Sequence, residues 1–166
     1  MTKNFGKLLL TMFNIGKIKL FPGTIASGIT SIMYLFLFNI KINYIILLIF
    51  LFLITVISII LINTLKNEFD EIDSKEIVID EYIGQSIPLI FFYVILFEAS
   101  SSTQFFFIIM FVSFIGFRFF DILKPFPINY VDKNIKSGLG VVLDDIIAGI
   151  YTTIVLYIFI IIYGKF

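Results

Sequence analysis

The sequence predicts an all-α integral membrane protein with four to five transmembrane helices plus an N-terminal interfacial amphipathic helix. The first observation is composition: 60% of the 166 residues are hydrophobic and 14% are charged, whereas a soluble domain is about 45 to 50% apolar. The second is a mean hydropathy of +1.08. The third is the division of the chain into long apolar runs joined by polar segments. Together these features predict one membrane-embedded domain over residues 1–166.

Apolar side chains recur at helical spacing near the N-terminus, and lysines lie beside them. The apolar positions are Phe5, Leu8, Leu9, Met12 and Phe13, and the lysines are Lys3, Lys7 and Lys17. This pattern is typical of a helix that lies in the membrane interface. A cleaved signal peptide is the alternative interpretation, but no A-x-A-like cleavage site follows, and the next stretch, KLFPGT, predicts a turn.

Five apolar runs are candidates for transmembrane helices. They are residues 24–38, 44–65, 83–97, 105–117 and 146–163. The second and fifth runs are long enough to cross a hydrocarbon core of ~30 Å, whereas the third and fourth are long enough only if the polar turns beside them continue the helices. Pro125 predicts the end of the fourth helix, since proline disrupts a helix interior.

Orientation follows from the basic residues, because cytoplasmic loops retain Lys and Arg. If the N-terminus is cytoplasmic and all five runs cross, most basic residues lie inside. The inside set is Lys3, Lys7, Lys17, Lys19, Lys66, Lys75, Arg118, Lys124, Lys133 and Lys136, and the outside set is Lys41 and Lys165. This topology places every polar cluster at the cytoplasmic end, namely residues 22–24, 79–85, 117–127 and 137–145. We therefore expect a site at that end of the bundle.

Five carboxylates at the predicted cytoplasmic helix ends are the candidate catalytic residues: Asp80, Glu81, Asp121, Asp144 and Asp145. A carboxylate at the centre of a membrane helix costs about 2.5 to 3.5 kcal/mol, so these groups need neutralisation or an interfacial position. The chain has no His and no Cys, which leaves oxygen ligands and predicts a hard cation, Mg²⁺ or Mn²⁺, rather than zinc. The expected metal ligands are Asp80, Glu81, Asp144 and Asp145.

Arg118 and Lys124 supply positive charge for a phosphate beside these carboxylates, since Mg²⁺ usually binds through one or two carboxylates, waters and a substrate phosphate. Arg118, Asp121 and Lys124 follow one another at intervals of three and so share part of a helical face. Turn motifs add three further phosphate-binding candidates, namely Thr24, Gly138 and Gly140. Glycines in such turns let backbone N–H groups approach a phosphate.

Each feature also has a purely structural interpretation. Asp80 or Asp144 alone is typical of a helix N-cap, although two adjacent carboxylates point ~100° apart and need more than one cap. The glycines before the last helix are compatible with a flexible turn, and Lys133 and Lys136 with the positive-inside rule alone. The acidic run of residues 67–76 predicts a solvated loop, and we assign it no role.

Four segments together resemble the phosphatidylglycerophosphatase A family of bacterial inner-membrane lipid phosphatases. In chain order they are FPGTIAS, EIVIDEYIGQ, FRFFDILKPFPI and VDKNIKSGLGVVLDDIIAG, and they cover the chain from about residue 14 to about residue 149. Two mild departures lie beside the motifs: Ala26 stands where the family more often has Gly, and Val142 stands where Met is common. The charged residues of the motifs are intact.

The resemblance implies Mg²⁺-dependent hydrolysis of phosphatidylglycerophosphate to phosphatidylglycerol and inorganic phosphate, by a multi-pass protein of the bacterial inner membrane whose site faces the cytoplasm. A chain without His, Cys or a D-x-D-T run lacks the groups for phosphohistidine, cysteinyl-phosphate and aspartyl-phosphate intermediates. Metal-activated water is the main remaining mechanism. In this mechanism the expected metal ligands, with Asp121 as a further candidate, hold one or two Mg²⁺ ions, while Arg118 and Lys124 stabilise the phosphoryl charge.

Two alternatives come from other classes of protein. Intramembrane carboxylates also line divalent-cation pathways, but a transporter places them near the midplane and on broken helices. A Mg²⁺-dependent phosphatidyltransferase would be another lipid-phosphate enzyme, but the chain lacks the D-G-x-x-A-R...G-x-x-x-D-x-x-x-D pattern of the CDP-alcohol family. The expected partner is therefore a lipid phosphate rather than a nucleic acid.

Overall fold

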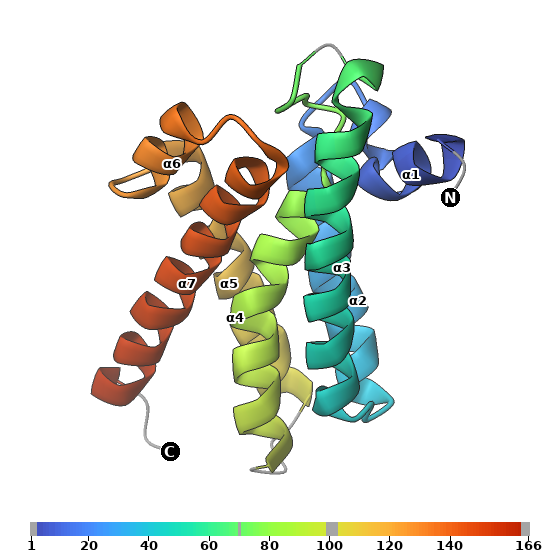
Figure 1. Ribbon diagram of the computed structural model, residues 1–166. Helices are drawn as coiled ribbons and strands as arrows, with labels where there is room; N and C mark the ends of the chain where they lie inside the picture. The colour runs from blue at the N-terminus through green and yellow to red at the C-terminus, as the bar shows by residue number, and fades with distance from the viewer. Residues whose placement is uncertain (1–2, 70, 99–102, 164–166) are drawn as a thin grey trace.

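The computed structural model describes residues 3–69, 71–98 and 103–163 as a bundle of helices (Figure 1). Its α-helices are α1 (Lys3–Leu10), α2 (Pro22–Asn39), α3 (Tyr44–Leu65), α4 (Ile79–Glu98), α5 (Thr103–Leu123), α6 (Ile128–Asn134) and α7 (Gly138–Tyr163). Short 3-10 turns lie at Ile15–Lys17 and Lys66–Glu68. The described residues contain no β-strand, which confirms the all-α fold class.

Four helices are long and apolar enough to cross a membrane. They are α4 and α5 over their full length, α3 with the turn after it (Tyr44–Glu68), and α7 over Gly138–Ile162. The first predicted segment, residues 24–38, is α2, which runs beside them (Figure 1) but is more polar, because its 18 residues include the buried Ser27, Thr30 and Ser31. The number of spanning helices agrees with the expected four to five.

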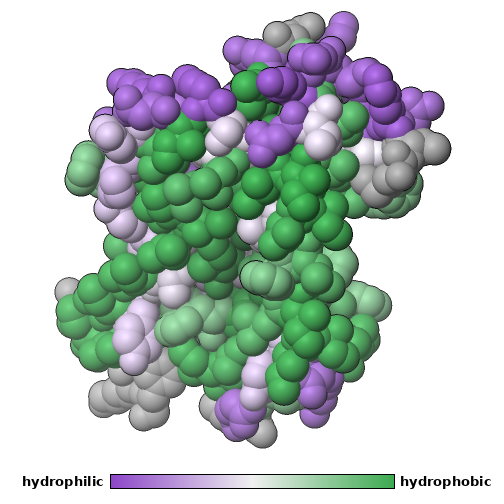
Figure 2. Space-filling view, viewed as in Figure 1, coloured by the Kyte–Doolittle hydropathy of each residue, from purple (hydrophilic) through white to green (hydrophobic). Residues whose placement is uncertain are grey.

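The polar segments of the chain meet at one end of the bundle. There α2, α4 and α7 begin and α3 and α5 end, while α1 and α6 lie beside these helix ends (Figure 1). Figure 2 shows the consequence on the surface: hydrophilic residues gather over this end, and an apolar band covers the middle of the molecule. We call this end the polar end, and its predicted cytoplasmic orientation is taken up below.

The helix boundaries explain how the polar motifs reach this end. α3 coincides with its apolar run, whereas α4 begins at Ile79, ahead of the run that starts at 83, and α5 continues past 117 to Leu123. α7 likewise begins at Gly138, ahead of the run that starts at 146. The motifs are therefore the end turns of the spanning helices, which gives these helices the length that a bilayer requires. The short α6 is not predicted from the sequence, since 7 residues show too little periodicity.

α4 is the central helix and packs against α2, α3, α5 and α7. It approaches α7 closely at two glycines. A Cβ on Gly84 would lie 2.6 Å from the carbonyl oxygen of Asp145, and a Cβ on Gly149 would overlap the carbonyl oxygen of Gly84. Small residues let membrane helices pack backbone to backbone in this way. The contact brings the first turns of α4 and α7 together, along with the carboxylates that they carry.

Aromatic packing holds the opposite end of the bundle. Phe38 of α2 stacks on Phe106 of α5 with ring centroids 4.3 Å apart, and it meets Tyr93 of α4 in a T-shaped contact at 5.2 Å. The Tyr93 hydroxyl donates to the carbonyl oxygens of Leu37 and Ile42, at 3.1 and 2.6 Å. These bonds tie α4 to the end of α2 and to the turn that follows it, and they give the buried Tyr93 hydroxyl its partners. The helices are thus fixed relative to one another below the polar end.

α1 is tied to the polar end by charge and by backbone pairing. Lys3 and Lys7 lie 2.8 and 3.0 Å from carboxylate oxygens of Glu68, and the Val78 N–H donates to the carbonyl oxygen of Leu10. Glu68 belongs to the acidic run that the sequence predicts as a solvated loop, so one residue of that run has a structural partner. The predicted N-terminal helix is present as α1, which contains Phe5, Leu8 and Leu9 and ends before Met12 and Phe13.

Candidate functional site

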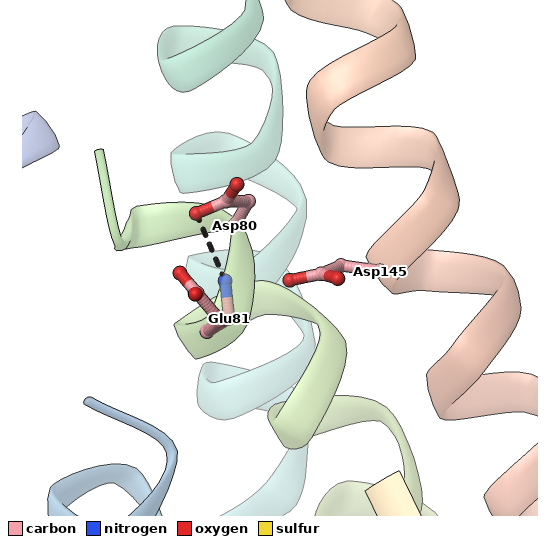
Figure 3. Close-up of side chains that lie close together, drawn as sticks. All are labelled: Asp80, Glu81 and Asp145. Carbon is pink, nitrogen blue, oxygen red and sulfur yellow. Dashed lines mark hydrogen bonds between the residues drawn. The ribbon is translucent and has the colours of Figure 1, made fainter. Parts of the chain in front are cut away.

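Three carboxylates meet between α4 and α7 at the polar end (Figure 3). Asp80 and Glu81 lie on the first turn of α4, and Asp145 lies near the start of α7. One ligand oxygen of each residue lies within 4.8 Å of the other two. Asp80 and Asp145 are only 7% and 4% exposed, and Glu81 is partly buried. We call these three residues the carboxylate cluster.

The start of α4 explains why Asp80 and Glu81 are presented together. Both carboxylates lie in the first turn of the helix, where the positive end of the helix dipole favours negative charge. Asp80 Oδ1 accepts a hydrogen bond from the Glu81 N–H at 3.1 Å. Asp80 therefore satisfies a backbone group at the helix start while its carboxylate remains in the cluster, so capping and ligand functions are compatible at this residue.

The carboxylate cluster fits a hard cation. Its donors are carboxylate oxygens alone, and Glu81 Oε2 is buried without a hydrogen-bond partner. Three ionised carboxylates at this separation would repel one another strongly in surroundings of low polarity, and a divalent cation would stabilise their ionised forms. Mg²⁺ prefers oxygen ligands and commonly completes its shell with water and phosphate. Asp80, Glu81 and Asp145 are the residues suited to hold it.

Arg118 and Asp121 lie beside the cluster on the last turns of α5. Arg118 Nη1 is 2.6 Å from Asp121 Oδ2, and the two side chains are 17% and 14% exposed. Asp121 also interacts with the carboxylates of Asp145 and Glu81. Arg118 Nε is buried without a hydrogen-bond partner. Asp121 therefore orients the Arg118 guanidinium, and the guanidinium still has an N–H group that can donate to an anion beside the cluster.

Lys124 leaves the helical face that the sequence spacing predicts for it. α5 ends at Leu123, and Lys124 adopts a left-handed φ of 43° before Pro125. Its ammonium donates to Asp132 of α6 and to Asp144 of α7, both at 2.8 Å. Burial by itself lowers the pKa of Lys124, but the hydrogen bonds and charges of these two carboxylates raise it overall. Lys124 therefore stays charged and joins the end of α5 to α6 and α7.

Asp144 is directed to Lys124 rather than to the carboxylate cluster. Asp144 is one of the four metal ligands expected from the sequence, but its Oδ2 accepts the hydrogen bond from Lys124. The physical reason is helical geometry, since adjacent residues lie ~100° apart around the axis. Asp145 faces α4, and Asp144 consequently faces the connection between α5 and α6. The adjacent pair is divided between the cluster and an ion pair.

The other predicted phosphate-binding residues lie in the first turns of α2 and α7. Thr24 is partly buried in α2. The Gly138 N–H donates to Asn63 Oδ1 at 2.8 Å, and a Cβ on Gly140 would overlap the carbonyl oxygen of Ile135. Both glycines thus have packing functions at the start of α7, against α3 and the loop before α7. Phosphate binding by these three residues stays a prediction.

Gly23 is a site residue that the sequence analysis does not single out. A Cβ at this position would overlap Glu81 Oε1, so α2 and the Glu81 carboxylate approach one another only because Gly23 has no side chain. The signal available in the sequence is the PGT turn, in which Thr24 rather than the glycine is assigned a role. The backbone of Gly23 packs against the Glu81 carboxylate.

The sequence matches the family model described as Phosphatidylglycerophosphatase A over residues 8–160. Among curated proteins, it is similar to Phosphatidylglycerophosphatase A of Haemophilus influenzae, with 41% identity over 85 residues that cover 51% of this chain and 46% of that protein. It is also similar to Phosphatidylglycerophosphatase A of Escherichia coli, with 34% identity over 85 residues that cover 51% of this chain and 44% of that protein.

A third similar protein is named putative phosphatidylinositol-3-phosphatase and comes from Bacteroides thetaiotaomicron. It is 33% identical over 84 residues, which cover 51% of this chain and 47% of that protein. The chain spans about half the length of the curated relatives it matches. No solved structure matches the chain.

Proposed function

The chain belongs to the phosphatidylglycerophosphatase A family, and we propose that it hydrolyses the terminal phosphate monoester of phosphatidylglycerophosphate, releasing phosphatidylglycerol and inorganic phosphate. The observation that carries this proposal is the meeting of Asp80, Glu81 and Asp145 beside Arg118, at the polar end of a bundle of apolar helices. The headgroup of a lipid phosphate lies at this depth, while its acyl chains stay beside the apolar helices. The positive charge of Arg118 and of a bound cation would then complement the negative phosphate, and the site would lie at the depth of the headgroup.

We assign the cation to the carboxylate cluster, where Asp80, Glu81 and Asp145 would hold one or two Mg²⁺ ions. When bound, Mg²⁺ supplies Lewis-acid polarisation of phosphoryl oxygens and acidifies the attacking water. Arg118 donates to the phosphate oxygens, and its planar guanidinium suits two parallel hydrogen bonds. Asp121 holds the guanidinium in place through the 2.6 Å contact. Together these residues stabilise the charge that develops as the phosphate ester bond breaks.

We further propose that the polar end faces the cytoplasm at the bacterial inner membrane. Exposed basic side chains at this end support the orientation under the positive-inside rule. Among the described residues they are Lys3, Lys17, Lys19, Lys66, Lys75, Lys133 and Lys136. The same charges attract an anionic lipid headgroup toward the site.

Phosphate release by the purified protein in detergent tests the proposal. The substrates are phosphatidylglycerophosphate, phosphatidate, phosphatidylinositol 3-phosphate and the water-soluble glycerol 3-phosphate. The highest kcat/KM is expected on phosphatidylglycerophosphate. The name of the third relative makes phosphatidylinositol 3-phosphate the second candidate, and faster turnover of that lipid would replace the proposed substrate. If no lipid phosphate is hydrolysed, the proposal is wrong, and divalent-cation uptake into proteoliposomes then tests the transporter alternative.

Removal of divalent cations is expected to abolish this activity. EDTA should stop phosphate release and added Mg²⁺ should restore it, because the cluster offers carboxylate oxygens. Zn²⁺ should restore it poorly, since Zn²⁺ is commonly bound by Cys and His. The measurement is the rate of phosphate release from chelator-treated protein after each metal is added back. Full activity in metal-free protein would contradict the assignment of a cation to the cluster.

Replacing Gly23 by Ala is expected to lower activity with little change in stability. The added methyl group displaces the end of the flexible Glu81 side chain rather than any backbone atom, so the Tm should stay close to that of the parent. Glu81 nevertheless moves away from Asp80 and Asp145. A misplacement of ~1 Å in a reacting site can cost about 10²-fold in rate, and we expect a loss of this order.

Gly28→Ala is the matched control, because Gly28 lies on the same helix and a Cβ there would meet only the Phe114 ring, at 3.9 Å. This variant should retain the parent rate of phosphate release and the parent Tm. Equal rates for Gly23→Ala and Gly28→Ala would show that Glu81 does not need its observed position.

A further inference from the structure

Gln85 lies on α4 one turn after Glu81 and has no part in the mechanism above. Its side chain is 0% exposed, and neither its amide nitrogen nor its amide oxygen has a hydrogen-bond partner among the described residues. Residues four apart lie on the same face of a helix. Gln85 therefore lies on the face of α4 that carries Glu81, one turn farther from the polar end.

A buried amide without partners lowers the stability of a protein. Its desolvation is not offset by hydrogen bonds, and replacement by an apolar side chain of similar shape is often neutral or stabilising. Water cannot reach such a group from the hydrocarbon region. Most residues in the membrane-spanning part of α4 are buried inside the bundle, and an apolar side chain at position 85 would carry no unpaired polar atoms there. The presence of a glutamine at this position is therefore better explained by a function in the site than by a contribution to stability.

The other buried groups without partners on α4 and on the neighbouring α5 are of complementary type. On α4, Glu81 Oε2 is an acceptor, and on the neighbouring α5, Ser113 Oγ and Arg118 Nε carry donors. A side-chain amide offers both functions, because its nitrogen donates and its oxygen accepts. The Gln85 nitrogen suits the Glu81 carboxylate, and the Gln85 oxygen is then free for a donor from α5.

We propose that Gln85 is a positioning residue for Glu81: when the cluster binds a divalent cation, the Gln85 amide nitrogen donates to Glu81 Oε2 and holds the carboxylate toward Asp80 and Asp145. Gly23 bounds the Glu81 carboxylate from α2, so the amide supplies the second constraint on its orientation. Partners that orient metal-binding groups typically contribute about 10- to 100-fold in metal affinity or activity. The inference rests on the proposed function only in its cation site and is independent of the lipid substrate.

Thermal unfolding in detergent, with and without Mg²⁺, tests this inference on the parent protein, Gln85→Met and Gln85→Leu. Without the cation, both variants are expected to unfold at the parent Tm or above, because two unpartnered polar atoms have been removed. The Mg²⁺ concentration that gives half of the Tm increase is expected to rise about 10- to 100-fold. Ser58→Ala is the matched control, since Ser58 Oγ is also buried without a partner but lies on α3. Its Mg²⁺ dependence should equal that of the parent.

An unchanged Mg²⁺ dependence in either folded variant overturns the proposal, and so does a parent protein whose Tm does not respond to Mg²⁺. If the cation-free variants have a lower Tm than the parent, or if neither variant folds, then the Gln85 amide stabilises the fold. Either result also overturns the proposal. Phosphate release from phosphatidylglycerophosphate is measured on the same samples. If release is absent while the parent keeps its Mg²⁺ response, the proposed substrate is wrong and the positioning function is judged on the Tm values alone.

Discussion

Replacing Asp145 by Asn is expected to lower phosphate release at least about 10³-fold, whereas Asp144→Asn should lower it less than about tenfold. Asp145 belongs to the carboxylate cluster, while Asp144 accepts a hydrogen bond from Lys124. Loss of a cation ligand removes Lewis-acid stabilisation worth several kcal/mol, and each 1.36 kcal/mol is tenfold in rate. Asparagine keeps an acceptor oxygen, so the hydrogen bond from Lys124 survives in Asp144→Asn.

The two variants should also differ in their response to Mg²⁺. Asp145→Asn should lose the Mg²⁺-induced increase in Tm, since the native state no longer binds the cation tightly. Without the cation, the Tm of Asp145→Asn should be no lower than that of the parent, because one of three neighbouring carboxylates has been removed. Asp144→Asn should keep most of the Mg²⁺-induced increase. Equal losses in both variants would mean that Asp144 leaves Lys124 when the cation binds, which restores the four-ligand set expected from the sequence.

The bundle could be predicted from the sequence because the bilayer imposes a length on every crossing helix. Residues 83–97 alone are too short to cross, so the helix has to include the polar turn before them, and α4 indeed begins at Ile79. The same requirement extends α5 toward Leu123. Once the helices alternate in direction, their polar turns must meet at one end. The predicted convergence of the carboxylates depends only on this topology and not on side-chain detail.

All three members of the cluster are among the four ligands expected from the sequence, but the separation of Asp144 from them could not be predicted, because it depends on the direction in which each side chain points. Asp144 and Asp145 look equivalent in the sequence, and the close approach of α4 to α7 at Gly84 selects Asp145. Lys124 has helical spacing from Asp121, but the left-handed turn before Pro125 sends its ammonium to Asp132. Asp132 lies in the segment VDKNIKSGLGVVLDDIIAG, but nothing in its spacing predicts a contact with Lys124.

The points at which two helices approach closely also could not be predicted from the sequence. The need for a glycine at position 23 can be recognised only once the structure shows that the Glu81 carboxylate packs against it. In a membrane, such contacts replace the hydrophobic effect as the means of fixing one helix on another, since lipid and apolar side chains are equally apolar. Glycines beside a polar motif are therefore informative about packing, although the partner has to come from the structure.

Arg118→Ala is expected to lower kcat/KM by about 10²- to 10³-fold, or about 2.7 to 4 kcal/mol, which is the loss typical of a preorganised transition-state donor. Arg118→Lys should recover only part of this, because an ammonium is a point charge and lacks the planar fork that pairs with two phosphate oxygens. Lys133→Ala is the control, since Lys133 is exposed on α6 and contributes only to the overall positive charge of the polar end. Equal, small losses at the two positions would mean that the phosphate contact is misassigned.

The Mg²⁺ affinity of Arg118→Ala distinguishes a phosphate contact from a support for the cluster. Arg118 places a positive charge near Glu81 and Asp121, and its removal makes the surroundings of the cluster more negative. Mg²⁺ should therefore bind Arg118→Ala as tightly as the parent or more tightly, while turnover falls. Asp145→Asn should lose both. If Arg118→Ala instead needs far more Mg²⁺ and regains the parent rate at saturation, then Arg118 acts by holding Asp121 and the cluster in place, and it does not contact the phosphate.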